Sequence, residues 1–170
     1  AGLLCEPLAR LGADVTGVDA APENTAAAAV HAERSGLDIR YMAGELAAQD
    51  IGTFDLVTAM EVIEHVADPA AFVRALAAKL APGGLMILST PNRTPLSRLA
   101  MITIGESIGG IPKGTHDWGK FLTPEELTVL LEEAGLDVTD SSGLSFDPAR
   151  GFALSANKAI NYLLTARHKS

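Results

Sequence analysis

Apolar segments that alternate with helical segments constrain the fold of this chain more than any other feature. Residues 14–19 (DVTGVD), 54–60 (FDLVTAM) and 85–89 (LMILS) have the pattern of short buried strands. A helix is expected from Pro22 to Arg34, because proline suits a first helical turn and alanines follow it. Strands joined by helices at this spacing predict a doubly wound α/β fold with a mostly parallel sheet.

Other parts of the chain carry weaker signals. Residues 39–42 form a less certain strand, and Asp68-Pro69 begins a helix that is expected to reach Leu80 and to close at Pro82-Gly83-Gly84. A helix from Pro124 to Ala134 precedes two strand candidates, 136–145 and 161–168. No convincing helix joins those two strands, so an antiparallel pair at the sheet edge is expected.

The chain opens at a helix, with Ala1-Gly2 leading directly into its first turn. An α/β protein normally places a strand before such a helix. We therefore expect residues 1–170 to be a single domain that is truncated at its N-terminal end and lacks its first strand.

Composition excludes several classes of function. The net charge of −8 and the absence of a Lys/Arg stripe make nucleic acid an unfavourable partner. The single cysteine, Cys5, cannot form an internal disulfide, which fits a reducing cytoplasm. No apolar run approaches the roughly 18 residues of a membrane span.

Asp19 is the first candidate site residue, because it ends a predicted strand. In a doubly wound fold the ligand lies beyond the carboxyl ends of the strands, where an acid accepts hydrogen bonds from ribose hydroxyls. Gly2 stands near the expected distance before it and would be the end of a glycine-rich loop. The alternative is that Asp19 only begins a turn.

The block Met60-Glu61-Val62-Ile63-Glu64-His65 follows the strand at 54–60. If the chain turns helical there, Glu61, Glu64 and His65 share one face and form a chelating set for a divalent cation. The alternative is a solvated helix start, in which the acids suit the helix dipole and His65 packs or acts alone as a base.

Several longer motifs resemble one known family. They are the segment around Asp19, MEVIEHVADP at 60–69, KLAPGGLMILSTPNRTPLS at 79–97 and IPKGTHDWGKFLTPEEL at 111–127. Together they look like the ubiquinone-biosynthesis O-methyltransferases, which have the class I, Rossmann-like methyltransferase fold with a seven-stranded type of sheet. The resemblance covers nearly the whole chain, and its first strand and leading glycines are missing here.

The resemblance implies a cofactor, a reaction and roles for particular residues. Asp19 would bind the ribose of S-adenosylmethionine, and Met60 would line its adenine or methionine end. Glu61, Glu64 and His65 match metal-binding positions, with Mg²⁺ favoured, and His65 is alternatively the base. The implied substrates are polyprenylated phenols and a demethylated ubiquinol, and other enzymes of that pathway are implied partners.

Three other interpretations stay open from the residues alone. The chain would be another small-molecule methyltransferase of this class, an NAD-dependent dehydrogenase that shares the sheet and Asp19, or a catalytically silent cofactor-binding fragment. The dehydrogenase leaves Glu61, Glu64 and His65 without an explanation. Turnover on a catechol separates the silent fragment from the enzymes.

Residues 94–113 form an insertion longer than the usual loop between a strand and a helix. The insertion is apolar, and in and beside it the basic Arg93, Arg98 and Lys113 outnumber the single acid Glu106. This pattern predicts contact with anionic lipid at the inner face of the membrane. The alternative is a helix that covers the active site or packs in a dimer.

Overall fold

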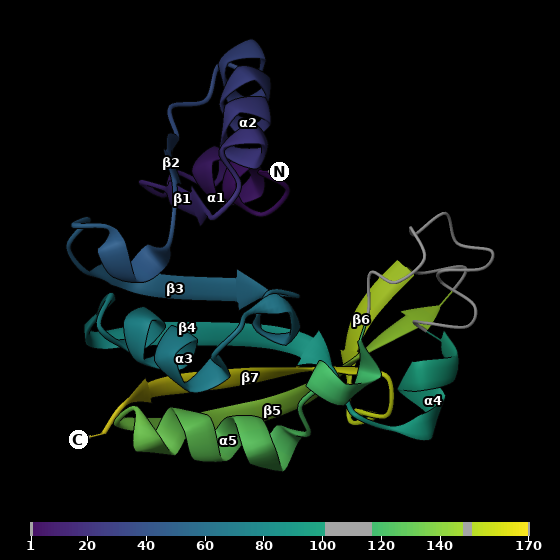
Figure 1. Ribbon diagram of the computed structural model, residues 1–170. Helices are drawn as coiled ribbons and strands as arrows, with labels where there is room; N and C mark the ends of the chain where they lie inside the picture. Colours follow the sequence, from purple (N-terminus) through teal and green to yellow (C-terminus); the bar gives the residue numbers. More distant parts are fainter. Residues whose placement is uncertain (1, 101–116, 148–150, 170) are drawn as a thin grey trace. The chain divides into compact units, whose positions relative to one another are not determined.

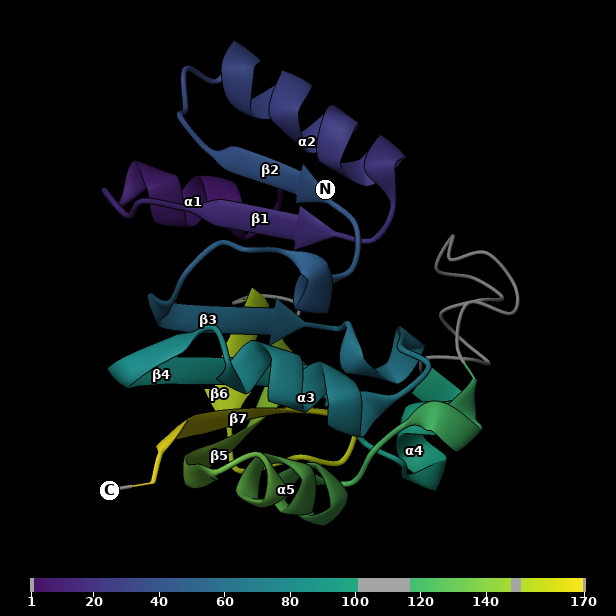
Figure 2. The same cartoon turned by 60° about the vertical axis from the view of Figure 1, so that its left-hand side comes forward.

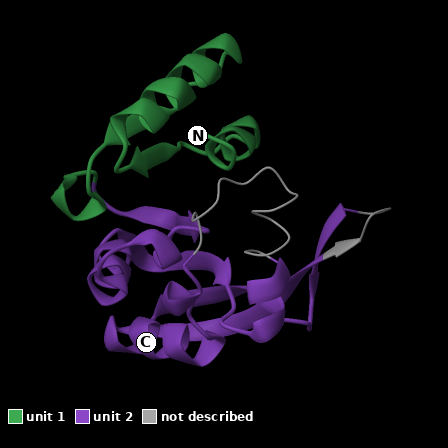
Figure 3. Cartoon of the chain, turned by 45° about the vertical axis from the view of Figure 1, so that its right-hand side comes forward, with its two compact units in different colours: residues 1–51 green, residues 52–170 purple. Residues whose placement is uncertain are grey.

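A computed structural model describes residues 2–100, 117–147 and 151–169. The chain divides into two compact units, residues 1–51 and 52–170 (Figure 3). Each unit is described by itself below. The single domain expected from the sequence stays a prediction.

The first unit is a parallel βαβ arrangement. The strands β1 and β2 pair in parallel, with Thr16 opposite Arg40 and Asp19 opposite Ala43. The crossover helix α2 buries Ala28 and Ala32, so its small residues form part of the core of this unit. The elements are α1 (Cys5–Arg10), β1 (Thr16–Asp19), α2 (Pro22–Arg34), β2 (Arg40–Ala43) and the 3₁₀ turn η1 (Leu46–Ala48).

The second unit contains a five-stranded mixed sheet in the order β3-β4-β7-β5-β6 (Figures 1 and 2). The pair β3–β4 is parallel, and the remaining pairs are antiparallel. Its elements are β3 (Phe54–Met60), η2 (Ile63–His65), α3 (Pro69–Ala77), β4 (Leu80–Pro91), α4 (Pro95–Ser97), η4 (Trp118–Lys120), α5 (Pro124–Glu133), β5 (Leu136–Asp147), β6 (Gly151–Ser155) and β7 (Asn161–His168).

Helices α3 and α5 pack against one another and against the sheet of this unit, on the same face (Figure 2). On β4, alternate residues Met86, Leu88 and Thr90 are fully or almost fully buried. They pair with Ala166, Leu164 and Tyr162 of β7, which are equally buried. Successive side chains of a strand point to opposite faces, so Ser89 and Pro91 point away from this set.

The α/β class with parallel strands joined by helices is confirmed. Helix α2 and strand β3 occupy the predicted residues, and Asp68 caps α3 by accepting a hydrogen bond from the Ala71 backbone N–H. The antiparallel pairing of β5 with β7 is also as expected. The pair is not the sheet edge, however, because β7 lies inside the sheet and β6 forms the edge.

Two boundaries differ from the sequence prediction. Helix α3 ends at Ala77, and Leu80 begins β4, so Pro82-Gly83-Gly84 lies within the strand instead of closing a helix. The pairing of β3 with β4 shifts register there, between Phe54 and Leu56. The Arg167 guanidinium donates to the Gly83 carbonyl from β7, which fixes this irregular segment to the sheet.

Candidate active site

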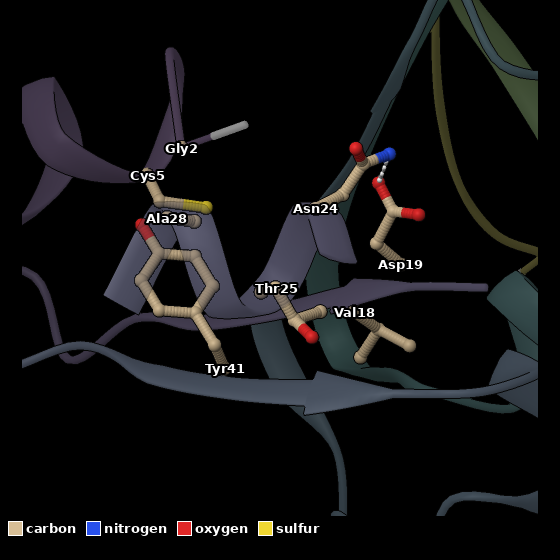
Figure 4. A pocket seen from close by; sticks show the side chains of 9 residues that line it. Gly2, Cys5, Val18, Asp19, Asn24, Thr25, Ala28 and Tyr41 are labelled. Atoms are coloured by element: carbon tan, nitrogen blue, oxygen red, sulfur yellow. Dashed lines mark hydrogen bonds between the residues drawn. The ribbon is translucent and has the colours of Figure 1, made fainter. Parts of the chain in front are cut away.

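Asp19 lies at the carboxyl end of β1, where its side chain is held in a local turn. Its Oδ1 accepts a hydrogen bond from the Ala21 backbone N–H at 2.8 Å, and its Oδ2 accepts one from Asn24 Nδ2 at 3.1 Å (Figure 4). A carboxylate oxygen accepts more than one hydrogen bond, so both oxygens keep capacity for a ligand hydroxyl. The carboxylate is therefore fixed in place and still able to bind.

A small pocket of ≈ 70 Å³ adjoins Asp19 within the first unit (Figure 4). Ligand pockets commonly measure roughly 300–1,000 Å³, so this pocket accounts for only part of a cofactor site. Its lining residues are Gly2, Cys5, Gly17, Val18, Asp19, Asn24, Thr25, Ala28 and Tyr41. The sequence prediction named Gly2 and Asp19, and the structure brings both to this one pocket.

Two features favour glycine at position 2. Its φ of +75° lies in the left-handed region, and a Cβ there would come within 2.8 Å of the Tyr41 hydroxyl. Burial raises the pKa of Tyr41 to about 12, so this hydroxyl stays protonated beside the glycine. A larger residue at position 2 would intrude on the pocket.

The segment after β3 does not form the helix that the sequence prediction assumed. Glu61 has a φ of +55°, and only residues 63–65 form a 3₁₀ turn. The reason is a contact with β4: the Glu61 N–H donates to the Ser89 carbonyl at 3.0 Å, which fixes the chain to the neighbouring strand. The shared helical face expected for Glu61, Glu64 and His65 is therefore wrong.

The Glu61 carboxylate accepts hydrogen bonds from two strands. Ser89 Oγ donates to Oε1 at 2.6 Å, and Asn161 Nδ2 donates to both Oε1 and Oε2 at 2.9 Å. Glu61 is nevertheless exposed, whereas Ser89 and Asn161 are buried. One side of the carboxylate is thus bound by the protein, and the residue remains accessible to a ligand.

Glu64 is buried, with 3% of its surface exposed. Its Oε2 accepts a hydrogen bond from Thr90 Oγ1 at 3.0 Å, while Oε1 is buried with no hydrogen-bond partner. Burial, with a smaller effect from the charge of Glu61, raises the pKa of Glu64 to about 7. Folding therefore favours the protonated form of this carboxyl group.

The two glutamates have different hydrogen-bond partners in this arrangement. Glu61 bonds to Ser89 and Glu64 bonds to Thr90, and these consecutive residues of β4 point to opposite faces of the sheet. Across residues 2–100, 117–147 and 151–169, no three His, Cys, Asp or Glu side chains are grouped to hold a metal ion. The residues predicted to bind Mg²⁺ do not fit a shared cation site.

His65 is partly accessible, with 46% of its side-chain surface exposed. Its Nε2 lies 3.7 Å from Glu64 Oε1, which is beyond hydrogen-bond distance. Met60, the last residue of β3, pairs with Ser89 and is half-buried.

Sequence patterns missed Ser89, Thr90 and Asn161, because no local motif marks a strand residue that bonds to a distant carboxylate.

Only residues 94–100 of the 94–113 segment can be described, since residues 101–116 lie outside the described residues. Leu96 and Leu99 are half exposed, and the Arg98 guanidinium lies 5.6 Å from the centre of the Trp118 ring. Trp118 Nε1 also donates to the Thr94 carbonyl, so the residues before and after the gap contact each other. Within the described ranges, no helix is both long and apolar enough to cross a membrane.

Comparison with known proteins identifies the family. The methyltransferase domain family matches residues 1–141. A ubiquinone biosynthesis O-methyltransferase of Cereibacter sphaeroides (strain ATCC 17025 / ATH 2.4.3) is 49% identical over 170 residues, which cover 95% of this chain and 68% of the relative. One from Methylobacterium sp. (strain 4-46) is 47% identical, with 97% and 68% covered. The chain belongs to the ubiquinone biosynthesis O-methyltransferase family.

Solved structures support the fold of this family member. An S-adenosylmethionine-dependent methyltransferase from Methanosarcina mazei superposes with a TM-score of 0.74 at 18% identity, covering 98% of this chain and 87% of that one. Magnesium protoporphyrin IX methyltransferase from Synechocystis PCC 6803, solved with bound S-adenosylhomocysteine, has a TM-score of 0.69 at 21% identity, with 96% and 68% covered. At these identities the likeness shows the class I methyltransferase fold.

Proposed function

We propose that this protein transfers a methyl group from S-adenosylmethionine to a phenolic hydroxyl of polyprenylated ubiquinone precursors. The observation that carries the proposal is the 49% identity to a ubiquinone biosynthesis O-methyltransferase over nearly the whole chain. The acceptors are a 2-polyprenyl-6-hydroxyphenol and 3-demethylubiquinol, as the resemblance implies. Asp19 and Gly2 are the proposed ribose-binding residues, and Met60 is a further proposed cofactor contact.

When bound, S-adenosylmethionine supplies an electrophilic sulfonium methyl group. The protein then has to orient the acceptor oxygen and to take its proton, since a phenol has a pKa of about 10 and is mostly neutral at pH 7. His65 is the proposed base, because its imidazole is accessible and histidine is the most frequent general base in enzymes. The proposed steps use only side chains of the protein.

A divalent cation, with Mg²⁺ favoured from the sequence, would need a different arrangement of residues 61–65. In this arrangement Glu61 bonds to Ser89 and Asn161, Glu64 bonds to Thr90, and among the described residues no three ligand side chains are grouped. We derive no step through a cation for this reason.

The direct test of the proposed function is turnover. The whole protein, incubated with S-adenosylmethionine and a catechol-type acceptor, is expected to yield the O-methylated product and one equivalent of S-adenosylhomocysteine, both measured by mass spectrometry. Activity confined to nitrogen or carbon acceptors would replace this function with that of another small-molecule methyltransferase. No turnover on any acceptor, with intact cofactor binding, would indicate a silent binding protein.

Membrane contact through residues 94–113 is a further part of the proposal. Support comes from the half-exposed Leu96 and Leu99 next to Arg98, an apolar and basic combination that suits anionic lipid. The protein is expected to float with anionic liposomes, and Leu99→Glu should release it. Flotation that does not depend on lipid charge would contradict this proposed contact.

Association with other enzymes of the pathway is proposed from the resemblance alone, and co-purification tests it.

A further inference from the structure

The surroundings of Glu61 combine several features that cost free energy in one place. Its φ of +55° lies in the left-handed region, which is unfavourable for a residue with a side chain. The Oδ1 atom of Asn161 is buried with no hydrogen-bond partner, which also costs stability. Costs of this kind persist where surrounding contacts maintain them, and they concentrate at functional sites.

The contacts that maintain these unfavourable features hold the Glu61 carboxylate in one position. Asn161 directs its Nδ2 at both oxygens of Glu61, and Ser89 Oγ donates to Oε1. The Glu61 N–H in turn bonds to Ser89 at both its carbonyl and its Oγ. Backbone and side chain of Glu61 are therefore both tied to the sheet, although the residue is exposed.

The location of this carboxylate also indicates a ligand contact. Glu61 directly follows the carboxyl end of β3, which is parallel to β4, and ligands of α/β folds lie beyond such strand ends. An ionised carboxylate only accepts hydrogen bonds, and among the described residues its donors are Ser89 of β4 and Asn161 of β7. A ligand approaching the exposed side must bring a donor, and a phenolic hydroxyl is one.

We propose that Glu61 accepts a hydrogen bond from the substrate hydroxyl next to the methylated oxygen, and that Asn161 and Ser89 position its carboxylate for this contact. The inference rests on the proposed function. Glu61 thereby selects acceptors with two adjacent oxygens and orients the ring. Asn161 and Ser89 are positioning residues, because they act through Glu61.

The first test is a double-mutant cycle in the whole protein, with kcat/KM on a catechol-type acceptor as the readout. Glu61→Ala and Asn161→Leu should each lower kcat/KM by about tenfold to a hundredfold, as expected for hydrogen bonds to a charged group. The double variant should lose no more than Glu61→Ala alone. The affinity for S-adenosylhomocysteine, measured by calorimetry, should not change.

A matched control uses Asn92, another buried asparagine with an unpartnered Oδ1, whose Nδ2 donates to the Lys158 carbonyl instead of Glu61. Asn92→Leu removes a similar amide, and its effect on kcat/KM should be the same whether residue 61 is Glu or Ala. If Asn161→Leu does not fold, Ser89→Ala replaces it in the cycle with a smaller expected loss, of about tenfold.

The second test compares acceptors, and a purely structural role would not affect it. On a phenol without the adjacent hydroxyl, Glu61→Ala should cost little, so the preference for the catechol should fall by about tenfold or more. The inference is overturned if the wild type methylates catechols but the double variant loses kcat/KM by the product of the two single losses. It is also overturned if Glu61→Ala lowers kcat/KM equally on both acceptors. A wild type that methylates no phenol overturns the proposed function, and this inference falls with it.

Discussion

Strands β1 and β3 both run parallel to a neighbour, and at the end of each a carboxylate is bound by an asparagine amide. The contacts of the two carboxylates differ in range. Asp19 is bound by donors only 2 and 5 residues away, whereas Ser89 and Asn161 lie 28 and 100 residues from Glu61. A short turn is enough to fix Asp19. Glu61 takes its position only when β3, β4 and β7 have assembled.

This difference in range separates two tasks that a methyltransferase has to perform. The local turn at Asp19 suits cofactor binding, since it forms within one βαβ unit. The long-range contacts of Glu61 and Glu64 join the end of β3 to the sheet of the second unit. Substitutions at the two places should therefore change different measured quantities.

The largest expected effect concerns Glu64, the buried counterpart of the exposed Glu61. Its folded-state pKa of about 7 exceeds its ordinary value of 4.5, so the folded protein retains a proton that the unfolded chain has already released. The resulting stability is complete below pH 4.5 and is lost as the pH rises through 7. At pH 8, Glu64→Gln should raise the free energy of unfolding by up to about 3 kcal/mol.

Denaturant unfolding between pH 4 and pH 9 measures this effect. The amide oxygen that Glu64→Gln introduces can still accept the hydrogen bond from Thr90, so the gain should shrink toward acid pH. Glu61→Gln is the control, because Glu61 is an exposed residue, and it should change only the smaller part of the dependence that its charge contributes. A Glu64→Gln variant that is less stable than the wild type at pH 8 would show that the ionised carboxylate is needed.

The next effect concerns cofactor affinity, and it tests directly whether Asp19 and Glu61 have different roles. Hydrogen bonds from a ribose to a charged group contribute roughly 1.5–3 kcal/mol. Asp19→Ala should therefore weaken S-adenosylhomocysteine binding by about tenfold to a hundredfold, measured by calorimetry. Glu61→Gln should leave the affinity unchanged. Equal losses for the two variants would mean that both carboxylates contact the cofactor.

The same contrast explains how much of the site the sequence could predict. Asp19 and the helix that starts at Pro22 carry local signals, namely a strand end followed by a proline at a helix start. The spacing of Glu61, Glu64 and His65 is equally local, and it predicted a helix. The contact between the Glu61 N–H and Ser89 overrides that pattern, and residues 28 positions apart give no local signal of it.

The fold shows the same limit at two further places. The proline and glycines at residues 82–84 normally stop a helix, but here pairing with β3 keeps the segment inside β4. Strand β6 was not predicted, although Phe152 and Leu154 alternate with small residues. Among the described strands it pairs with β5 alone, and both of these large side chains are exposed, so it lacks the buried face that makes a strand recognisable.

The smallest expected effect is that of metal removal, and it tests whether Glu61 and Glu64 act separately. A cation that both carboxylates bind would make turnover depend on it, and each substitution alone would weaken its binding strongly. Separate roles for the two carboxylates predict that protein stripped of metal keeps its turnover in excess EDTA. They also predict that Glu61→Gln lowers kcat/KM, while Glu64→Gln changes mainly the dependence of stability on pH. Turnover that vanishes in EDTA and returns with Mg²⁺ would show that residues 61–65 rearrange during the reaction. The side chains at 61, 64 and 65 would then come together around the cation, an arrangement that the contacts with Ser89, Asn161 and Thr90 do not show in this structure.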